Sequence, residues 1–200
     1  VEQFPSKPDT REEAKMQKSF ARNRRKELQE IPGTKEWTAH MERLDRELKK
    51  TELIHYGNTK YDPAKVAPVK NDDGSWNGGV KPYSGGLWLS PANAHYSWER
   101  FVETDMDDSK SRVESFSIKL DPKAKVLIID SLADLKSVSS RRIGDHVVMD
   151  FEALAKEYDA IWLTEKGMWD TRDSAPGQPT TYGWDCETVY VMNPDVIKPL

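Results

Sequence analysis

The spacing of the hydrophobic residues changes near residue 50, and before that point it is helical. Apolar side chains recur every three or four positions after Thr34, which would cap their helix; they are Trp37, Met41, Leu44 and Leu48. A thinner apolar stripe predicts an earlier helix, which starts at Asp9 or Thr10 as its cap and ends near Glu30. Residues 1–50 are therefore expected to form a helical hairpin, which either packs on the rest of the chain or binds a protein partner.

Beyond residue 52, short runs of strand character follow one another and are separated by Gly, Pro, Asn and Asp. The predicted strands cover residues 53–56, 86–89, 115–120, 126–129, 160–163 and 189–192, with helices over residues 95–101 and 150–158. Few strand pairs are joined by long helices, which favours an α+β sheet domain over a doubly wound one. We expect two domains, a helical arm over residues 1–50 and a sheet domain over residues 51–200.

Two long segments without strong periodicity interrupt the sheet domain, residues 60–84 and 165–184. Both are rich in Gly and Pro, and both also contain Trp and Tyr. Loops of this length in a small domain are usually functional or disordered, and aromatic residues disfavour plain linkers. We therefore expect both loops to border a binding site.

Composition and charge disfavour several classes of function, among them nucleic-acid binding, metal binding and insertion into a membrane. The net charge is -4, and residues 51–200 carry most of the acidic excess, which disfavours a nucleic-acid partner. The single cysteine allows no intrachain disulfide and makes a cysteine-based zinc site improbable, so no metal is expected. No apolar run has the length that crosses a membrane. A soluble protein is expected, either cytoplasmic or delivered into the cytosol of a host or target cell.

Three predicted strands carry a polar residue at an end flanked by glycine or aromatic residues. His55 lies in a strand that runs towards Gly57, where the absence of a side chain lets a ligand approach the backbone. The second strand follows Gly86, and Glu187 opens the last strand. Taken singly, such a histidine is more often a core residue and such a glutamate is usually solvated. The combination indicates one functional site.

Together these segments resemble the diphtheria-toxin and poly(ADP-ribose) polymerase branch of the ADP-ribosyltransferases. Residues 53–59 resemble the strand that carries the histidine of that family, and residues 86–90 resemble its glycine-led central strand. Residues 185–191 resemble the strand that begins with the catalytic glutamate. The resemblance covers residues 52–200. It implies a split antiparallel β-sheet core and NAD as the substrate, with no metal.

The resemblance implies a role for each site residue. Glu187 would hold a ribose hydroxyl and stabilise the oxocarbenium-like charge that develops when the nicotinamide–ribose bond breaks. His55 would bind the adenosine ribose. Either Tyr96 or Trp88 would be the central aromatic residue, and the two would clamp nicotinamide by stacking. The remaining cofactor contacts would come from Tyr56, Gly57, Thr59 and Ser90, with the Ser90 hydroxyl on the carboxamide.

The sequence departs from the family pattern at two of these positions. Tyr56 stands between His55 and Gly57, where the family has the glycine directly after the histidine. Trp88 replaces the strand tyrosine and offers a ring without a hydroxyl group. A backbone N–H and C=O do not depend on the side chain, so Tyr56 can supply the same backbone bonds to the nicotinamide amide.

An acceptor site is expected beside the catalytic glutamate. Asp185 precedes Glu187 by two positions, so in a strand both side chains would point to the same face. Two carboxylates there could hold a cationic acceptor such as an arginine guanidinium group. Trp184 and Gln178, from the loop of residues 165–184, would contact the target, while the loop of residues 60–84 would cover NAD.

These observations predict a mono-ADP-ribosyltransferase that moves ADP-ribose from NAD to a protein, in a toxin, an effector or a defence enzyme. A catalytically inactive relative that binds ADP-ribose or a protein partner is the first alternative, and the departures at Tyr56 and Trp88 support it. A transferase acting on nucleic acid is a second alternative, which the acidic sheet domain disfavours. The third is an unrelated α+β domain in which the motifs coincide by chance.

Overall fold

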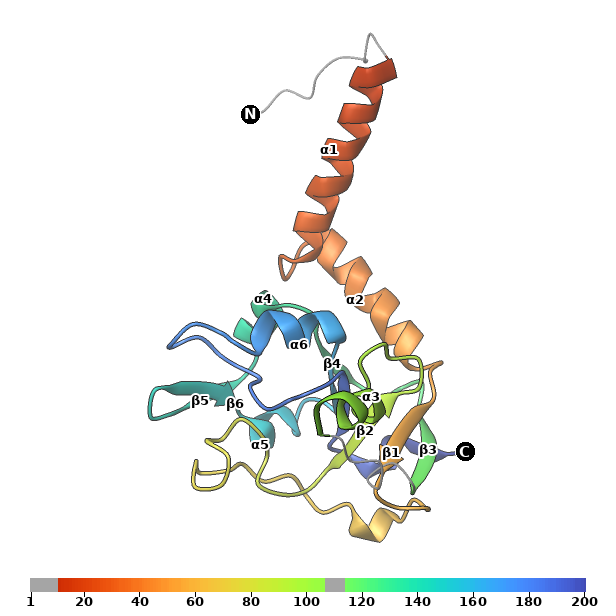
Figure 1. Ribbon diagram of the computed structural model, residues 1–200, viewed down its shortest axis with the longest axis vertical. Helices are drawn as coiled ribbons and strands as arrows, with labels where there is room; N and C mark the ends of the chain where they lie inside the picture. The colour runs from red at the N-terminus through yellow and green to blue at the C-terminus, as the bar shows by residue number, and fades with distance from the viewer. Residues whose placement is uncertain (1–10, 107–113) are drawn as a thin grey trace. The chain divides into compact units, whose positions relative to one another are not determined.

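The computed structural model of the chain describes residues 11–106 and 114–200 (Figure 1). The two caps proposed for the first helix, Asp9 and Thr10, lie outside the described residues. The chain divides into two compact units, one ending at Glu42 and the other running from Arg43 to Leu200. The division falls inside a helix, earlier in the chain than the expected boundary at residue 50.

The first unit holds helix α1 (Arg11–Gln29) and the beginning of helix α2 (Lys35–Leu48), as the apolar spacing predicts. Thr34 caps α2, because its hydroxyl oxygen accepts a 3.1 Å hydrogen bond from the backbone N–H of Trp37. The end of α2 belongs to the second unit, where Leu48 is fully buried.

The second unit is built on a sheet in the order β4-β7-β8-β2-β1-β3-β9. Its strands are β1 (Leu53–Tyr56), β2 (Leu87–Pro91), β3 (Ser115–Leu120), β4 (Val126–Ile129), β7 (Ala160–Leu163), β8 (Thr188–Val191) and β9 (Ile197–Pro199). Only the β4–β7 pair is parallel, and the other pairs are antiparallel. The expected α+β class with a mainly antiparallel sheet is confirmed.

Short elements complete the unit. Strands β5 (Ser140–Ile143) and β6 (His146–Met149) form a separate antiparallel hairpin that the polar sequence of β5 did not indicate. The helices are α3 (Trp98–Phe101), α4 (Leu132–Lys136), α5 (Phe151–Leu154) and α6 (Glu165–Thr171), together with the short turns η1 (Pro63–Lys65), η2 (Val102–Met106) and η4 (Pro194–Val196).

Three of these helices correct the sequence-based expectations. The predicted helix over residues 150–158 ends earlier, at Leu154, although Asp150 does cap it by accepting a bond from the Ala153 N–H. Helix α3 starts only at Trp98, because the Ser97 side chain caps it there, and so leaves Tyr96 outside. Helix α6 occupies the first part of a segment predicted to be a loop.

Gly167 explains why α6 was missed. Glycine usually marks a loop, but here a Cβ on residue 167 would lie 2.0 Å from the carbonyl oxygen of Ile129. The glycine therefore allows the helix to pack directly against the end of β4. Thr164 starts the helix by accepting a 3.0 Å hydrogen bond from the Gly167 N–H.

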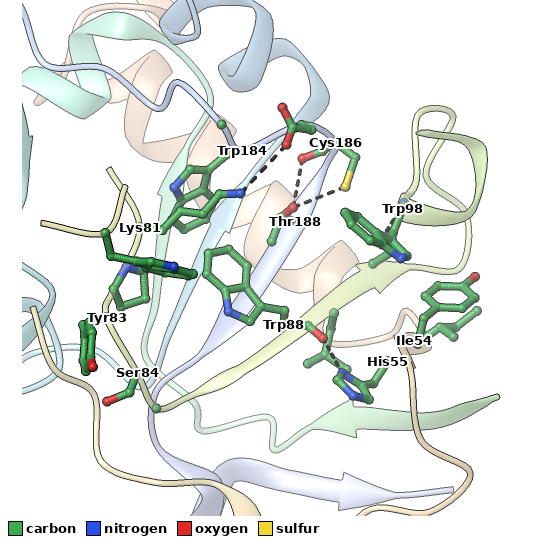
Figure 2. Close-up of a pocket in the computed structure, with 18 residues that line it drawn as sticks. Ile54, His55, Lys81, Tyr83, Ser84, Trp88, Trp98, Trp184, Cys186 and Thr188 are labelled. Atoms are coloured by element: carbon green, nitrogen blue, oxygen red, sulfur yellow. Dashed lines mark hydrogen bonds and ion pairs between the residues drawn. The ribbon is translucent and has the colours of Figure 1, made fainter. Parts of the chain in front are cut away.

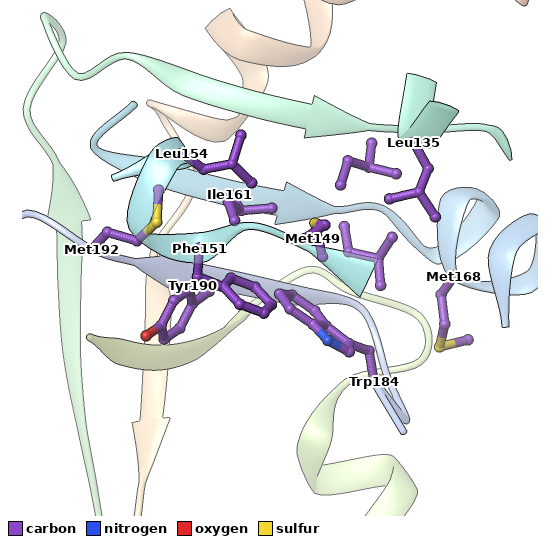
Figure 3. Packing of buried hydrophobic residues seen from close by; sticks show 11 residues of the cluster. Leu135, Met149, Phe151, Leu154, Ile161, Met168, Trp184, Tyr190 and Met192 are labelled. Atoms are coloured by element: carbon purple, nitrogen blue, oxygen red, sulfur yellow. The ribbon is translucent and has the colours of Figure 1, made fainter. Parts of the chain in front are cut away.

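The hydrophobic core lies on one face of β4, β7 and β8 (Figure 3). Its largest side chains are Trp184 and Tyr190, which are 1% and 0% exposed, and the Phe151 ring packs against both. The Tyr190 hydroxyl donates a 2.9 Å hydrogen bond to the carbonyl oxygen of Gly85. The core thereby fixes the chain at the start of β2, which also borders the functional site.

The sheet splits between β1 and β2. These strands pair at two positions, Leu53 with Pro91 and Ile54 with Ser90. Beyond Ile54, β1 continues to pair with β3, whereas β2 pairs with β8. The two halves of the sheet therefore separate beside His55, and the separation provides room for a cavity.

Candidate functional site

A cavity of about 430 Å³ opens at the split between β1 and β2 (Figure 2). Aromatic rings from both strands, from α3 and from both long loops lie on its walls; they are Tyr56, Trp76, Tyr83, Trp88, Trp98 and Trp184. Residues from both long loops thus line the cavity. The volume and the apolar lining are those of a small-molecule site, so we call it the aromatic cavity.

His55 occupies the point at which the strands diverge. Its Nδ1 lies 2.9 Å from the carbonyl oxygen of Trp88, where a ladder hydrogen bond between β1 and β2 would otherwise continue (Figure 2). A carbonyl group only accepts, so Nδ1 carries the proton, and Nε2 accepts from the Asn58 amide at 3.2 Å. The Phe116 ring packs against the imidazole, with the ring centres 4.9 Å apart. The histidine is thereby held in one tautomer and one orientation.

Ser90 fixes one aromatic wall of the cavity. Its buried hydroxyl oxygen accepts a 2.9 Å hydrogen bond from the backbone N–H of Trp98, which places the Trp98 side chain on the cavity. Cys186 lies on the same wall, and burial raises the pKa of its thiol to about 11. The thiol therefore stays protonated at neutral pH and forms part of the wall.

Asp185 lies on the aromatic cavity between two cationic side chains. Its Oδ2 is 3.9 Å from the Lys81 Nζ, and its Oδ1 is 3.4 Å from a guanidinium nitrogen of Arg172. Lys81 also lines the cavity, and it comes from the loop before β2. The cavity therefore carries one positive and one negative side chain, Lys81 and Asp185, and Arg172 meets Asp185 although it does not itself line the cavity.

Glu187 does not line the aromatic cavity. It borders a second cavity, of about 290 Å³, where its Oε1 accepts a 2.9 Å hydrogen bond from the Trp162 indole N–H. The pKa of its carboxyl group is raised to about 7, mainly by burial and also by the negative charges of Glu165 and Asp130, while the Trp162 hydrogen bond opposes the shift. The structure therefore does not bring His55 and Glu187 to one cavity.

The separation of Asp185 from Glu187 corrects the expectation that both carboxylates share one face. That expectation assumed a strand, but β8 begins only at Thr188, so the residues before it do not alternate with a period of two. Asp185, Cys186 and Thr188 line the aromatic cavity, whereas Glu187 faces the second one.

Tyr96 is also absent from the aromatic cavity. Its hydroxyl group donates a hydrogen bond to Asp105, and its ring packs against Trp169, with the ring centres 5.6 Å apart. Trp98, the first residue of α3, lines the cavity instead. Of the two candidates for the central aromatic residue, Trp88 alone lies on the cavity.

Some of the residues predicted to contact the cofactor or the acceptor line the cavity, and others do not. His55, Tyr56, Trp88, Ser90, Trp184 and Asp185 line it, whereas Gly57, Thr59 and Gln178 do not. Trp184 was expected on the acceptor loop, but it is buried, and its indole N–H donates a 2.9 Å hydrogen bond to the Val80 carbonyl oxygen. It is a wall of the cavity and a member of the core.

Sequence reasoning missed several lining residues, among them Lys81, Tyr83 and Trp98. A usable signal exists for the first two, because they stand directly before the Gly85-Gly86 pair that leads into β2. For Trp98 the signal is the cap residue Ser97, which starts the helix at the indole.

Within residues 11–106 and 114–200, no group of three or more His, Cys, Asp or Glu side chains is placed to hold a metal ion. None of the helices in the described part of the chain combines the length and the apolar character needed to cross a bilayer. Comparisons of the chain with family models, with curated proteins and with solved structures find no match.

Proposed function

We propose that this protein is an NAD-dependent mono-ADP-ribosyltransferase that modifies a protein acceptor. The observation that carries the proposal is the split between β1 and β2, which opens into an aromatic cavity with His55 at the divergence. Segments that resemble the transferases in sequence supply the adjacent walls of this cavity. A split sheet with the histidine strand beside the glycine-led strand is also what the resemblance implies.

The cavity suits the nicotinamide half of NAD. The indoles of Trp88 and Trp98 offer flat surfaces for the nicotinamide ring, and the backbone of Tyr56 lies on the same cavity for the carboxamide. Holding the ring and the ribose in one orientation would supply part of the rate enhancement. The Ser90 oxygen already accepts from Trp98, so its role is to hold this wall as well as to bind the carboxamide.

Cleavage of the nicotinamide–ribose bond requires a carboxylate beside the ribose to stabilise the positive charge. The resemblance assigns this role to Glu187, whereas the geometry favours Asp185, which lies on the cavity. The two residues are separated in sequence only by Cys186. Two variants, Glu187→Gln and Asp185→Asn, separate these assignments without changing side-chain volume.

The test incubates the purified protein with NAD labelled in the ADP-ribose part and with a cell lysate. We expect label on a protein band, and its loss in His55→Ala and in one of the two carboxylate variants. Label that nuclease treatment removes would replace the protein acceptor by nucleic acid. If the wild type neither consumes NAD nor transfers label, the transferase proposal is wrong.

An inactive NAD or ADP-ribose binder is the second candidate, and one observation favours it. The Glu187 carboxyl group is buried in a cavity separate from the aromatic one and is hydrogen-bonded to Trp162. Calorimetric binding of NAD without release of nicotinamide over hours would favour this candidate over the transferase.

A further inference from the structure

Two cationic side chains meet one carboxylate at the edge of the aromatic cavity, where Lys81 and Asp185 line the cavity and Arg172 pairs with Asp185 from outside its lining. Lys81 and Arg172 both face Asp185, and the exposed fractions of the three side chains are 33%, 28% and 22%. Two cations therefore share one carboxylate at the border between the cavity and solvent. Lys81 reaches it from the loop before β2, and Arg172 from the end of α6.

Both ion pairs are loose. The contact distances are 3.9 Å for Lys81 and 3.4 Å for Arg172, whereas a charge-assisted hydrogen bond between such groups is about 2.7–2.9 Å long. Partly exposed ion pairs of this length contribute little to stability. An anion with more negative charge can therefore replace Asp185 beside the two cations with little loss of stability.

The surroundings define which anion fits. Trp76 and Tyr83 line the cavity with Lys81, are both more than half exposed, and lie edge to face with their ring centres 6.4 Å apart. Exposed rings beside two cations suit a ligand that combines a flat base with phosphate groups. A nucleoside diphosphate has this chemistry, and its two phosphates can contact both cations.

We propose that Lys81 and Arg172 form a diphosphate subsite at the edge of the aromatic cavity, and that Asp185 occupies this subsite as an internal substitute anion in the free protein. The inference rests on the proposed function in that NAD would be the natural ligand. Binding of the diphosphate releases Asp185 from its two cations. The freed carboxylate then faces the ribose and a cationic acceptor, so the donor binds before the acceptor.

The test measures ADP binding by calorimetry, because ADP carries the diphosphate and the base without nicotinamide. Lys81→Met and Arg172→Met should each weaken ADP binding roughly tenfold, since each removes a charge-assisted contact. Asp185→Asn should tighten it severalfold, because it removes the competing anion. The matched controls are Lys65→Met and Asp145→Asn, which make the same charge changes at exposed positions that do not line the cavity and should leave ADP binding unchanged.

The sign of the Asp185→Asn effect decides the inference. Weaker ADP binding in this variant, or wild-type binding in both cation variants, would overturn it. Lys81→Arg keeps the charge and should bind ADP within about threefold of the wild type, whereas adenosine binding should not respond to Lys81→Met. A Lys81→Met variant that also loses adenosine binding is misfolded. In that case the comparison of ADP binding rests on Lys81→Arg.

The outcomes separate this inference from the transferase proposal. Should NAD remain intact while ADP binding follows the predicted charge pattern, the transferase proposal falls and the diphosphate subsite stands. Should NAD be cleaved while ADP binding ignores Lys81, Arg172 and Asp185, the subsite falls and the transferase proposal stands.

Discussion

Trp162 donates a 2.9 Å hydrogen bond from its indole N–H to Oε1 of Glu187, whose residue is only 9% exposed. The bond holds the carboxyl group on the second cavity, away from His55 and the aromatic cavity. Burial, with the nearby charges of Glu165 and Asp130, raises the pKa of Glu187 to about 7. This environment gives the protein a stability that depends on pH.

The first prediction concerns that dependence. The pKa of Glu187 is higher in the folded state than its ordinary value of 4.5, so the folded state binds more protons between these pH values. The free energy of unfolding should therefore fall as pH rises through this window, by roughly 3 kcal/mol in total. Both states are protonated below the window, and the loss is complete above pH 7.

Urea unfolding at a series of pH values measures this slope. Glu187→Gln should remove most of it between pH 5 and 7, whereas Glu157→Gln, at an exposed position, should keep it. Trp162→Phe removes the hydrogen bond that lowers the pKa of Glu187 and should raise that pKa further. A wild-type slope in Glu187→Gln would show that another group titrates.

The second prediction separates the two aromatic candidates. Trp98 lines the aromatic cavity and Tyr96 does not, so Trp98→Ala should weaken NAD binding by about tenfold or more, as loss of a stacking ring does. Tyr96→Phe keeps the ring against Trp169 and should bind NAD as the wild type does. Calorimetry gives both affinities. Equal losses in the two variants would contradict the observed geometry.

The third prediction concerns the glycine that leads into β2. Gly86 has a φ of +62°, and a Cβ there would lie 2.4 Å from the Tyr190 ring. Gly86→Ala should therefore destabilise the protein by about 2–4 kcal/mol, through backbone strain and displacement of a core ring. Gly177 also has a positive φ, of +79°, but its Cβ would meet no atom within 4 Å.

Gly177→Ala is thus the matched control, with a cost of about 1 kcal/mol from strain alone. Thermal and urea unfolding of both variants give the comparison. If the two variants lose the same stability, then contact between residue 86 and the Tyr190 ring is not the reason for the glycine.

The fourth prediction concerns the loop that carries Trp76 and Lys81 to the cavity. Asp72 is fully buried, and its carboxylate accepts backbone hydrogen bonds from Trp76, Asn77 and Gly79. Asp72→Ala leaves these donors without the carboxylate and should cost about 2–3 kcal/mol of stability. Ligand affinity should fall as well, because the loop no longer holds Lys81 in place.

Asp73→Ala is the neighbouring control. Its side chain is exposed and accepts from the Ser75 backbone N–H in the same loop, so its loss should cost little and leave ligand affinity unchanged. Hydrogen exchange of residues 74–81 measures the order of the loop directly. Unchanged protection in Asp72→Ala would mean that other contacts hold the loop.

The sequence by itself determined the elements whose signals are local. Strands β1, β3, β4 and β7 have the predicted bounds, because alternation or a continuous apolar run spans each of them. Thr34 and Asp150 cap their helices as expected, since a cap involves only residues within one turn. The aromatic content of the two long loops disfavoured plain linkers, and both loops contribute side chains to the cavity.

Only the tertiary structure decided which side chains meet in the site. The separation of Asp185 from Glu187 depends on where β8 begins, and the approach of Lys81 and Arg172 to Asp185 joins three distant segments. Where the β1–β2 pairing stops, the His55 side chain bonds to the Trp88 carbonyl oxygen, a contact between residues 33 positions apart. Local patterns set which face of its own element a residue occupies, but the packing of whole elements sets which cavity that face lines.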